Sequence, residues 1–415
     1  MITTSASIVN FACTSAPLRC LRMWKQQKFD LIIVGGGPAG STAARFAAIG
    51  GISVLLLEKD RDIGVPVRCG EAASDEGLRI FVDPDTRWIK SVITKLRLIS
   101  PSEHTIDIDL KQKGYILDRR IFDYDLAQYA ADEGAQIVCK AYVDGLLFKD
   151  GKVAGVTGEH LGERFEVESD IVIGADGVES RVGRWAGLAT VVKMKDMESA
   201  IQKTIAGIEV DEHRFDFYMS REWAPGGYLW IFPKGPNAAN IGLGVSGKYS
   251  RFRSAQRYLD DFLAKTFPDG SVISSTVGGV PCDKTLKKFV TDGLMLAGDS
   301  AHMVNPMTGG GIVPGMRGGM LAGETAVEAI KAGDTSEKFL NRYPKAWHKI
   351  GGKNHERFYS IKEAIFRLTD KELDSIVAAV EKISPDERSI AKVFRKAVFK
   401  KPSLVVDVMK VFAGI

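Results

Sequence analysis

The sequence predicts a mixed α/β (α+β) fold with three parts: a domain around a parallel sheet, a domain around an antiparallel sheet and a C-terminal helical region. Three observations predict it. An apolar strand, a glycine-rich turn and a helical pattern follow one another near residue 35, strands of alternating polarity occupy the middle of the chain, and helical patterns dominate after residue 331. The 415 residues, 45% of them hydrophobic, suffice for two or three domains.

Composition excludes several classes of protein. No apolar run approaches the roughly 18 residues of a membrane-spanning helix, so any contact with a membrane should be peripheral. The five cysteines are far apart and form neither a CxxC pair nor a Cys/His cluster, which argues against a disulfide framework and a metal site. We therefore expect a protein of the reducing cytoplasm that binds no metal.

Residues 1–27 precede the first predicted strand. They contain no acidic residue and are rich in Ser, Thr and Ala. Met23 stands shortly before the glycine-rich turn, at a spacing usual for proteins that begin directly with such a strand. We expect residues 1–27 to be a disordered or non-native N-terminal tail.

The first strand, turn and helix belong to the segment FDLIIVGGGPAGSTAARFAAIGGISVLLLEK, residues 29–59. Gly35 permits a tight turn, Gly37 lets a pyrophosphate approach the N–H groups of the helix N-terminus, and Gly40 lets helix and strand pack closely. Glu58 ends the next strand, where its carboxylate can accept hydrogen bonds from a ribose. The unit predicts a Rossmann-type dinucleotide-binding domain.

Two later segments favour FAD over NAD as the dinucleotide. DIVIGADGVESRVGRWAG is an apolar strand that runs into Asp176 and Gly177, and GLMLAGDSAHMVNPMTGGGIVPGM is another that runs into Asp299 and then Gly311. Together with the first motif they resemble the p-hydroxybenzoate hydroxylase-like FAD-dependent oxidoreductases. The chain departs from many of these relatives at Gly183, where they have an arginine.

The resemblance implies a fold and a set of cofactor contacts. Asp299 would bond the ribityl chain, and the helix that opens at Gly311 and Ile312 would point its N-terminus at the flavin pyrimidine ring. Arg119 matches an arginine near the pyrophosphate, and Arg120 should be its solvated neighbour. The cofactor-binding residues implied are Gly35, Gly37, Ala39, Gly40, Glu58, Lys59, Cys69, Gly70, Ala72, Arg119, Val143, Asp176, Gly177, Asp299, Gly311 and Ile312.

Two further segments resemble the geranylgeranyl reductase family, particularly the archaeal-type enzymes that saturate prenyl chains of membrane lipids. GVPVRCGEAAS carries Cys69 and Gly70, and YLWIFPKGPNAANIGLG has the pattern Tyr-x-Trp-x-Phe-Pro followed by Gly-x-Gly. The resemblance covers roughly residues 28–370. It implies an FAD-dependent reductase of C=C bonds in geranylgeranyl chains, such as those of digeranylgeranylglycerophospholipid precursors.

The second of these segments supplies the predicted prenyl-binding wall. On a strand, Tyr228, Trp230 and Phe232 face one side while Leu229 and Ile231 face the other. Packing of the three rings in a core is the alternative, and the flavin motifs favour the wall. The substrate-binding residues predicted are Tyr228, Trp230, Phe232, Pro233, Gly242 and Gly244. Gly242-x-Gly244-x-x-Gly247 also fits a dinucleotide motif, but the polar segment after it does not suit a buried helix.

The chemistry implied is hydride transfer from reduced flavin to one alkene carbon and proton donation to the other. Positive character on the more substituted carbon can be stabilised by aromatic faces, so Tyr228 and Trp230 are predicted catalytic residues together with Cys69. Cys69 is a candidate proton donor or positioning group, with simple packing as the alternative. Because no second nucleotide domain is predicted, NAD(P)H or a ferredoxin-like carrier should deliver electrons transiently.

Two other functions stay open at this point. A monooxygenase or halogenase could share the fold, although a halogenase predicts a lysine in the segment after Glu58 and GVPVRCGEAAS has none. A flavin-bound prenyl-lipid carrier without catalysis belongs to a different class. It would bind prenyl lipid without reoxidising the flavin.

We divide the chain into a tail, two interleaved domains and a helical end. The FAD-binding domain comprises residues 28–75, 112–190 and 280–330, the antiparallel substrate domain residues 76–111 and 191–279, and the helical region residues 331–415. Thr369-x-x-Glu372 and Ser384-x-x-Glu387 each read as capping boxes. With a last apolar helix that includes Leu404, Val405, Val408 and Phe412, they predict a helical lid over a hydrophobic tunnel.

Residues 331–415 hold more Lys and Arg than Asp and Glu, whereas the chain before them is slightly acidic. Arg395, Lys396, Lys400 and Lys401 flank the last apolar face, as expected of a segment that lies on an anionic membrane or docks an acidic electron carrier. No recognition motif accompanies the charge, so nucleic acid is not an expected partner.

Overall fold

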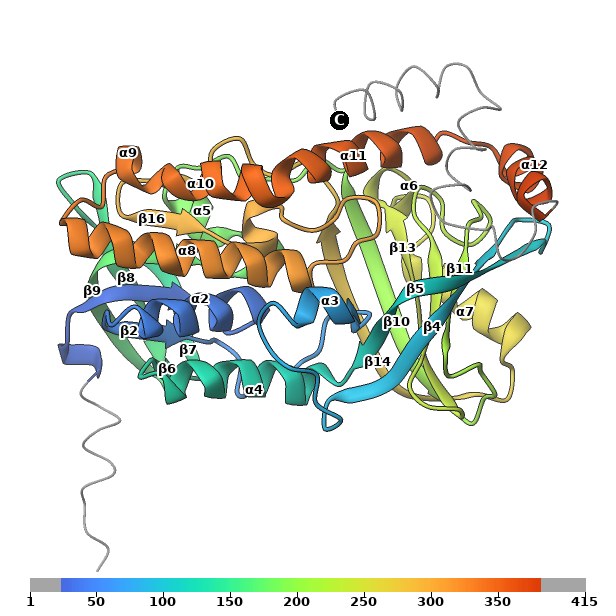
Figure 1. Ribbon diagram of the computed structural model, residues 1–415, viewed down its shortest axis with the longest axis horizontal. Coiled ribbons are helices and arrows are strands. Elements are labelled where there is room, and N and C mark those ends of the chain that lie inside the picture. Colours follow the sequence, from blue (N-terminus) through green and yellow to red (C-terminus); the bar gives the residue numbers. More distant parts are fainter. Residues whose placement is uncertain (1–23, 382–415) are drawn as a thin grey trace, which may run out of the picture.

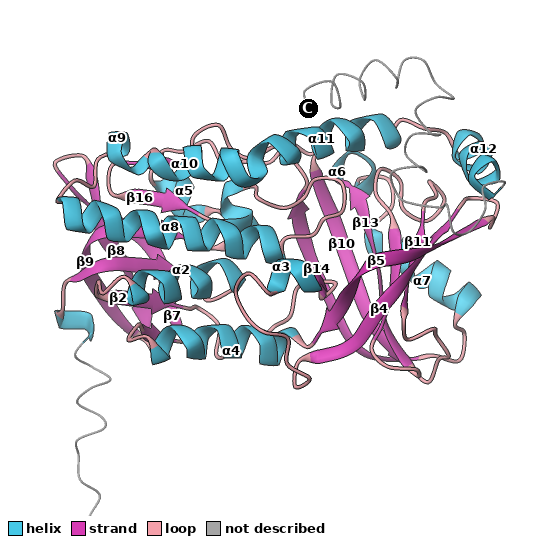
Figure 2. Cartoon of the chain, in the orientation of Figure 1, coloured by secondary structure: helices cyan, strands magenta, loops and turns pink. Residues whose placement is uncertain are grey.

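The computed structural model describes residues 24–381, which form two sheets joined by helices (Figures 1 and 2). The first sheet has eight strands, of which six follow the order β15-β16-β9-β1-β2-β6, and β7 and β8 extend it beside β9. Its strands are β1 (Phe29–Val34), β2 (Val54–Leu57), β6 (Gln136–Val138), β7 (Ala141–Lys149), β8 (Lys152–His160), β9 (Glu163–Gly174), β15 (Val290–Thr291) and β16 (Leu294–Leu296).

The centre of the first sheet is parallel, as the motif predicts. β1 pairs in parallel with both β2 and β9, and β16 pairs in parallel with β9. β1, β2 and β16 are buried almost throughout, as expected of their continuous apolar runs. The helices α2 and α8 pack face to face: a Cβ atom on Gly319 of α8 would lie 2.1 Å from the Ala39 carbonyl oxygen of α2.

The described helices connect and cover the two sheets. They are η1 (Trp24–Gln26), α2 (Pro38–Ile49), α3 (Asp75–Leu78), α4 (Arg119–Asp132), η2 (Gly177–Glu179), α5 (Arg181–Trp185), α6 (Gly247–Ser250), α7 (Ala255–Thr266), η3 (Gly298–Ala301), α8 (Ile312–Ala332), α9 (Glu337–Leu340), α10 (Arg342–Trp347), η4 (His348–Gly352), α11 (Lys353–Ile365) and α12 (Asp370–Glu381). None of these helices is both long and apolar enough to span a bilayer.

The second sheet has eight strands in the order β14-β10-β13-β12-β11-β4-β5-β3. They are β3 (Ala72–Ser74), β4 (Ile89–Ile99), β5 (Thr105–Leu117), β10 (Met197–Ala206), β11 (Arg214–Tyr218), β12 (Leu229–Pro233), β13 (Ala238–Ser246) and β14 (Ser271–Pro281). All its pairs are antiparallel except β4 with β11, which come from distant parts of the chain and need no hairpin between them. The domain boundary predicted at residue 112 falls inside β5, because this strand pairs with β4 both before and after that residue.

The N-terminal end of the described chain differs from the expected tail. Trp24 is buried against Phe165 and His160, with its ring centroid 5.0 Å from that of Phe165. A large aromatic ring in such contacts belongs to the core, so residues 24–27 are part of the folded unit. Sequence composition did not reveal this contact, which joins segments far apart in the chain.

The helices after α8 run along the top of the molecule, and α11 crosses from the first sheet to the second (Figure 1). The predicted capping box at Thr369 is confirmed: its backbone N–H donates to Glu372 Oε2 at 2.8 Å, and the Glu372 N–H donates to Thr369 Oγ1 at 3.4 Å. α12 then packs on β5 through Val377 and Val380. The predicted capping box at Ser384, the last apolar helix and its four basic residues lie outside the described residues.

A buried ion pair holds α11 in place. Lys362 of α11 and Asp196, just before β10, have side chains only 2% and 1% exposed, and Lys362 Nζ lies 2.9 Å from Asp196 Oδ1. Burial alone would raise the pKa of Asp196, but hydrogen bonds from Lys362 and Tyr359 and the nearby positive charges lower it below its ordinary value. Lys362 also donates to the Cys282 carbonyl oxygen at 2.6 Å, so one ammonium group joins three segments.

Replacing one partner of this pair should destabilise the protein strongly. Asp196→Asn leaves the Lys362 ammonium buried without its counter-charge, and we expect the free energy of unfolding in urea to fall by about 3–5 kcal/mol. The control is Glu328→Gln, which breaks an exposed pair with Arg342 and should cost at most about 1 kcal/mol. Equal losses for the two variants would show that the buried pair does not anchor α11.

Candidate active site

A cavity of about 1200 Å³ lies between the two sheets and under α11. It is continuous from the glycine-rich turn before α2 to the aromatic strand β12 and the inner side of α11. The predicted site residues that line it are Gly37, Ala39, Lys59, Cys69, Gly70, Ala72, Arg119, Asp176, Gly177, Tyr228, Trp230, Phe232, Gly244, Asp299, Gly311 and Ile312. The structure therefore brings most predicted cofactor residues and most predicted substrate residues to one space.

Six predicted site residues do not line the cavity. Gly35 and Gly40 shape the turn from within, because a Cβ atom on Gly40 would lie 1.9 Å from the Gly35 carbonyl oxygen. Glu58 accepts a hydrogen bond from the Gly36 N–H at 2.7 Å, so it braces the same turn. Val143 is buried in the core around the first sheet. The other two are Pro233 and Gly242.

Two helix N-termini open into the cavity. α2 begins after Gly37 and α8 after Gly311, and neither helix has a side chain that caps its first N–H groups. A Cβ atom on Gly37 would meet no atom within 4 Å, so the space beside this turn is open. Free N–H groups at the positive end of a helix favour an anionic or electron-rich ligand group.

Two partly buried carboxylates, those of Asp176 and Asp299, lie near these helix ends. Asp176 Oδ2 accepts from the Val182 N–H at 2.9 Å, whereas its Oδ1 is buried without a hydrogen-bond partner within residues 24–381. Burial raises the pKa of Asp176, and it raises that of Asp299 to about 6 against the opposing charge of Arg119. Buried acceptors of this kind need donors, which the hydroxyl and amine groups of a ligand can provide.

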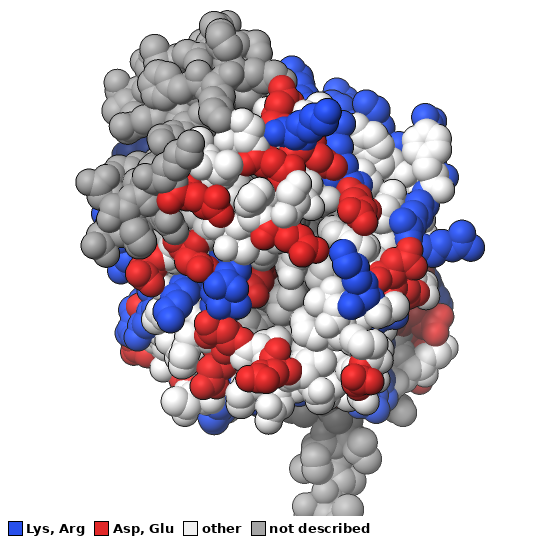
Figure 3. All heavy atoms as spheres, turned by 90° about the vertical axis from the view of Figure 1, so that its right-hand side faces the viewer, with Lys and Arg blue, Asp and Glu red and all other residues white. Residues whose placement is uncertain are grey.

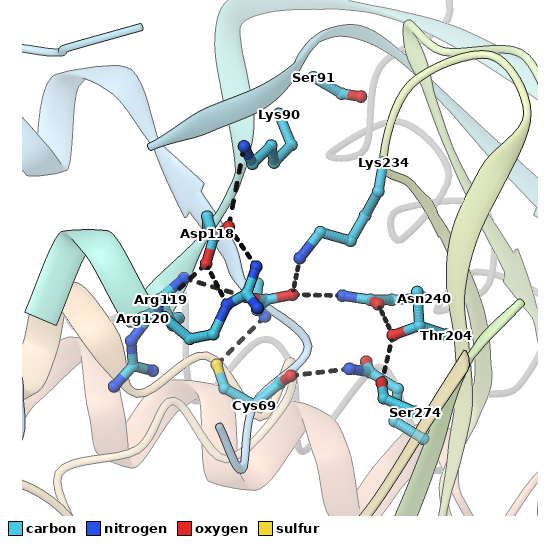
Figure 4. Close-up of polar contacts among 12 residues, drawn as sticks. Cys69, Lys90, Ser91, Asp118, Arg119, Arg120, Thr204, Lys234, Asn240 and Ser274 are labelled. Carbon is cyan, nitrogen blue, oxygen red and sulfur yellow. Dashed lines mark hydrogen bonds and ion pairs between the residues drawn. The ribbon is translucent and has the colours of Figure 1, made fainter. Parts of the chain in front are cut away.

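A carboxylate that the sequence did not single out holds the Cys69 loop against the second sheet. Glu71 Oε2 accepts from Lys234 Nζ at 2.5 Å and from Asn240 Nδ2 at 2.6 Å, and its Oε1 accepts from the Arg119 N–H at 3.0 Å (Figure 4). Glu71 has a φ of 70°, a left-handed value that this residue type adopts rarely. Only the three-dimensional contacts distinguish it from other glutamates.

Cys69 and Arg119 form the next part of this cluster. The Cys69 Sγ accepts from the Glu71 N–H at 3.1 Å (Figure 4). Burial raises the pKa of the Cys69 thiol, while the charge of Arg119 lowers it. Arg119 is buried and forms two hydrogen bonds of 2.6 Å with Asp123, which keep its guanidinium charged. Arg120 is mostly exposed and pairs with Asp118, as predicted for a solvated neighbour.

The aromatic side chains of β12, and Tyr228 just before it, line the cavity, and Phe232 also packs in a small core cluster with Ile93 and Ile116. Trp230 stacks on Phe232 with ring centroids 6.0 Å apart, and Tyr228 meets Trp230 edge-on at 5.8 Å. Leu229 and Ile231 point to the opposite side, into the core under α7. Two aromatic residues of β11 that the sequence did not single out, Phe215 and Phe217, extend the wall. Their alternation is the same signal, on a strand of the same length.

The glycines of the Gly-x-Gly pattern make room for this wall. Gly242 of β13 pairs with Trp230 of β12, and a Cβ atom on Gly242 would lie 2.4 Å from the indole ring. Trp230 Nε1 donates to Gln202 Oε1 at 3.0 Å, and Gln202 Nε2 donates to the Cys69 carbonyl oxygen at 2.9 Å. Gln202 of β10 was not predicted, and it links the wall to the Cys69 loop.

The comparisons agree with this geometry. A model described as the geranylgeranyl reductase catalytic domain matches residues 196–280, which span β10 to β14, and an NAD(P)-binding Rossmann-like domain model matches residues 33–96. The chain is 38% identical over 388 residues to a digeranylgeranylglycerophospholipid reductase of Methanocella arvoryzae, covering 92% of this chain and 99% of the relative. A relative of that name from Methanosarcina mazei is 42% identical over 382 residues, covering 90% and 94%.

The chain belongs to the digeranylgeranylglycerophospholipid reductase family. Among solved structures, a geranylgeranyl bacteriochlorophyll reductase-like protein from Thermoplasma acidophilum has 36% identity and a TM-score of 0.88, covering 93% of this chain and 99% of that one. A flavin-dependent brominase has a TM-score of 0.68 at 18% identity, with coverages of 90% and 99%, which shows a shared fold alone. The predicted family and mixed α/β fold are confirmed, and the relatives favour the reductase family over the halogenases.

A methyl group at Gly242 should disturb the wall of this reductase-family protein. Because it would overlap the Trp230 ring and the Ile201 carbonyl oxygen, we expect Gly242→Ala to lower the free energy of unfolding by about 1–3 kcal/mol and to change the near-UV circular dichroism of the aromatic residues. The control is Gly278→Ala on β14, where the added methyl meets no atom within 4 Å. If both variants behave alike, Gly242 is not needed for the ring's position.

Proposed function

We propose that this protein is an FAD-dependent reductase that saturates C=C bonds in the geranylgeranyl chains of digeranylgeranylglycerophospholipid precursors. The observation that carries the proposal is the single cavity that joins two helix N-termini and two partly buried carboxylates to an aromatic wall. The helix ends and the carboxylates suit a polar cofactor, and the aromatic wall suits an apolar chain. The names and identities of the relatives support the same activity.

The residues at the first end of the cavity fit FAD. The Asp176 Oδ1 atom lacks a partner in the described structure, Asp299 lines the cavity, and the uncapped end of α2 is open at Gly37. These groups would accept from ribose and ribityl hydroxyls and donate to phosphates. When bound and reduced, FAD supplies the hydride.

The other end of the cavity fits a prenyl chain. Leu96, Leu98 and Leu110 continue the lining beyond the aromatic wall, and α11 closes it with Ile361 and Ile365. Burial of an apolar chain against such surface stabilises the complex by about 25 cal/mol per Å². The faces of Tyr228 and Trp230 would stabilise positive character on an alkene carbon. Helix α11 thus forms one wall of the proposed tunnel.

Cys69 lies where the two ends meet, and its loop is held by Glu71 and Gln202. Burial favours its neutral thiol form. We assign it to the reacting end of the chain, as a positioning group whose thiol can also donate a proton. The Cys69 carbonyl oxygen and the Trp230 indole are both hydrogen-bonded to Gln202, which links the loop to the wall.

Electrons reach this site from an external donor, NAD(P)H or a ferredoxin-like carrier, in our proposal. Gly242, Gly244 and Gly247 lie in β13 and α6 of the second sheet, so they do not open a second Rossmann unit. On the end of the molecule formed by the second sheet, acidic and basic side chains are interspersed (Figure 3). We propose that any peripheral contact with an anionic membrane is made by the basic segment around Lys400, which lies outside the described residues.

The purified protein should contain non-covalent FAD. We expect acid or heat treatment to release one flavin that migrates as FAD in chromatography, and Asp299→Ala to lower the flavin content because the buried carboxylate is lost. Asp269→Ala, an exposed substitution in the second domain, is the control and should keep the flavin. Recovery of FMN, or equal flavin in both variants, would contradict the proposed site.

Trp230→Ala should impair turnover of long prenyl substrates and leave the FAD content unchanged. The indole lines the substrate end of the cavity, and its removal costs about 3–5 kcal/mol of packing in general, so folding is checked by circular dichroism. Trp230→Phe keeps an aromatic face and should retain more activity. The assay is anaerobic reoxidation of the reduced flavin by geranylgeranyl phospholipid.

The same assay separates the alternatives. A monooxygenase would reoxidise only when oxygen is present, and a lipid carrier would bind the phospholipid without reoxidation. Full activity of a folded, flavin-containing Trp230→Ala protein would mean that the ring is packing rather than part of the substrate site.

A further inference from the structure

We propose that Glu198 is the general acid of the reaction, which donates the proton to the alkene carbon that does not receive the hydride. The proposal rests on the proposed function and deepens it. Glu198 is the second residue of β10 and lines the same cavity as Cys69 and Tyr228. It lies within residues 196–280, which match the reductase catalytic domain model, but no sequence pattern marks it.

The geometry around Glu198 indicates a group aimed at a ligand. Its Oε2 atom is buried and has no hydrogen-bond partner among residues 24–381. A buried carboxyl oxygen without a hydrogen-bond partner destabilises the folded protein, so its presence in a cavity wall calls for a functional explanation. Donation of its proton to a substrate that enters the cavity is such an explanation.

Two glycines leave the space that Glu198 occupies. A Cβ atom on Gly227 would lie 3.1 Å from Glu198 Oε2, and a Cβ atom on Gly244 would lie 3.7 Å from it. Gly244 is the second glycine of the Gly-x-Gly pattern, whose first glycine, Gly242, holds the Trp230 ring. The pattern thus places the Trp230 ring beside Gly242 and the Glu198 carboxyl group beside Gly244, on one side of the sheet.

The surroundings of Glu198 keep it protonated. Burial raises the pKa of Glu198 to about 8, although Lys362 lowers it, and Asp196 raises it further. The other titratable groups that face it are the hydroxyl of Tyr228 and the thiol of Cys282, and burial raises the pKa of both well above its ordinary value. Among these groups Glu198 has the acid strength closest to neutral pH, where a general acid is most effective.

In the proposed saturation step, the π bond of the isolated alkene breaks. One carbon forms a C–H bond with the hydride of reduced FAD, and the other forms a C–H bond with the proton of the Glu198 carboxyl group. The flavin loses two electrons, and Glu198 is left as a carboxylate that regains a proton from solvent before the next turnover. The charge of Lys362 stabilises that carboxylate in the interval.

The test compares anaerobic flavin reoxidation by digeranylgeranylglycerophospholipid micelles in the wild type, Glu198→Gln and Glu198→Asp. We expect the flavin of Glu198→Gln to be reoxidised about 100-fold more slowly, with unchanged flavin content and an unchanged substrate-induced spectral shift. Glu198→Asp should recover part of the rate. Glu209→Gln, an exposed residue just beyond β10, is the matched control. Cys69→Ser in the same assay shows whether the thiol is the acid instead.

Two readouts distinguish an acid from a packing residue. The wild-type rate should be high below pH 8 and fall as the pH rises through that value, because the donating form is the neutral acid, whereas Glu198→Gln should show no such fall. Infrared difference spectra at pH 7, without substrate, should show the C=O stretch of a protonated carboxyl group that is missing in Glu198→Gln. The infrared readout does not depend on activity.

The outcomes are separable. A wild type that binds the lipid but is not reoxidised by it overturns the proposed function, and proton delivery by Glu198 with it. A wild type that is reoxidised while Glu198→Gln keeps the same rate overturns the role of Glu198 alone, as does an infrared spectrum without the protonated carboxyl band. A large loss in Cys69→Ser with none in Glu198→Gln returns the acid role to Cys69.

Discussion

The buried carboxylate of Glu71 is the interaction that holds the Cys69 loop against the second sheet, and the shape of the cavity depends on this loop. It accepts hydrogen bonds from Lys234 and Asn240 of the second sheet and from the Arg119 N–H at the start of α4. The segment that contains Cys69 and Glu71 connects β2 of the first sheet to β3 of the second and lines the cavity, so something must hold it in place without filling the space. A charged group with three donors does this in a place where apolar packing would close the cavity. The Cys69 loop gains its position from the same contacts.

Local sequence was sufficient to predict those parts of the fold that are determined by neighbouring residues in the chain. The turn at Gly35, the capping box at Thr369 and the alternation of Tyr228, Trp230 and Phe232 all follow from neighbours in the chain, and the structure has each of them. The fold class followed from the order of such elements. The boundary inside β5 and the parallel pairing of β4 with β11 depend on contacts between distant segments, which no local pattern records.

The candidate site shows the same division. Glycine-rich turns and aromatic strands are recognisable from the sequence, whereas single polar residues such as Glu71, Glu198 and Gln202 look like ordinary surface residues until their burial is known. Gly242 and Gly244 were recognised by resemblance, and their physical reason appeared only across the sheet, where each leaves space for the side chain of another strand. The buried ion pair of Lys362 is a further case, since a lysine on an amphipathic helix is usually solvated.

The aliphatic part of the cavity lining has a kinetic consequence. The side chains of Leu96, Leu98, Leu110, Ile361 and Ile365 offer carbon and hydrogen only, so in the proposed function they would bind a polyprenyl chain without favouring one axial register over another. Translocation of the chain by one isoprene unit then exchanges one set of dispersion contacts for an equivalent set, with little change in free energy. A tunnel of this kind permits processive action, in which successive double bonds are drawn past one reactive point before the lipid dissociates. The order of saturation along the chain would then be set by how far it threads, and not by recognition of any individual bond.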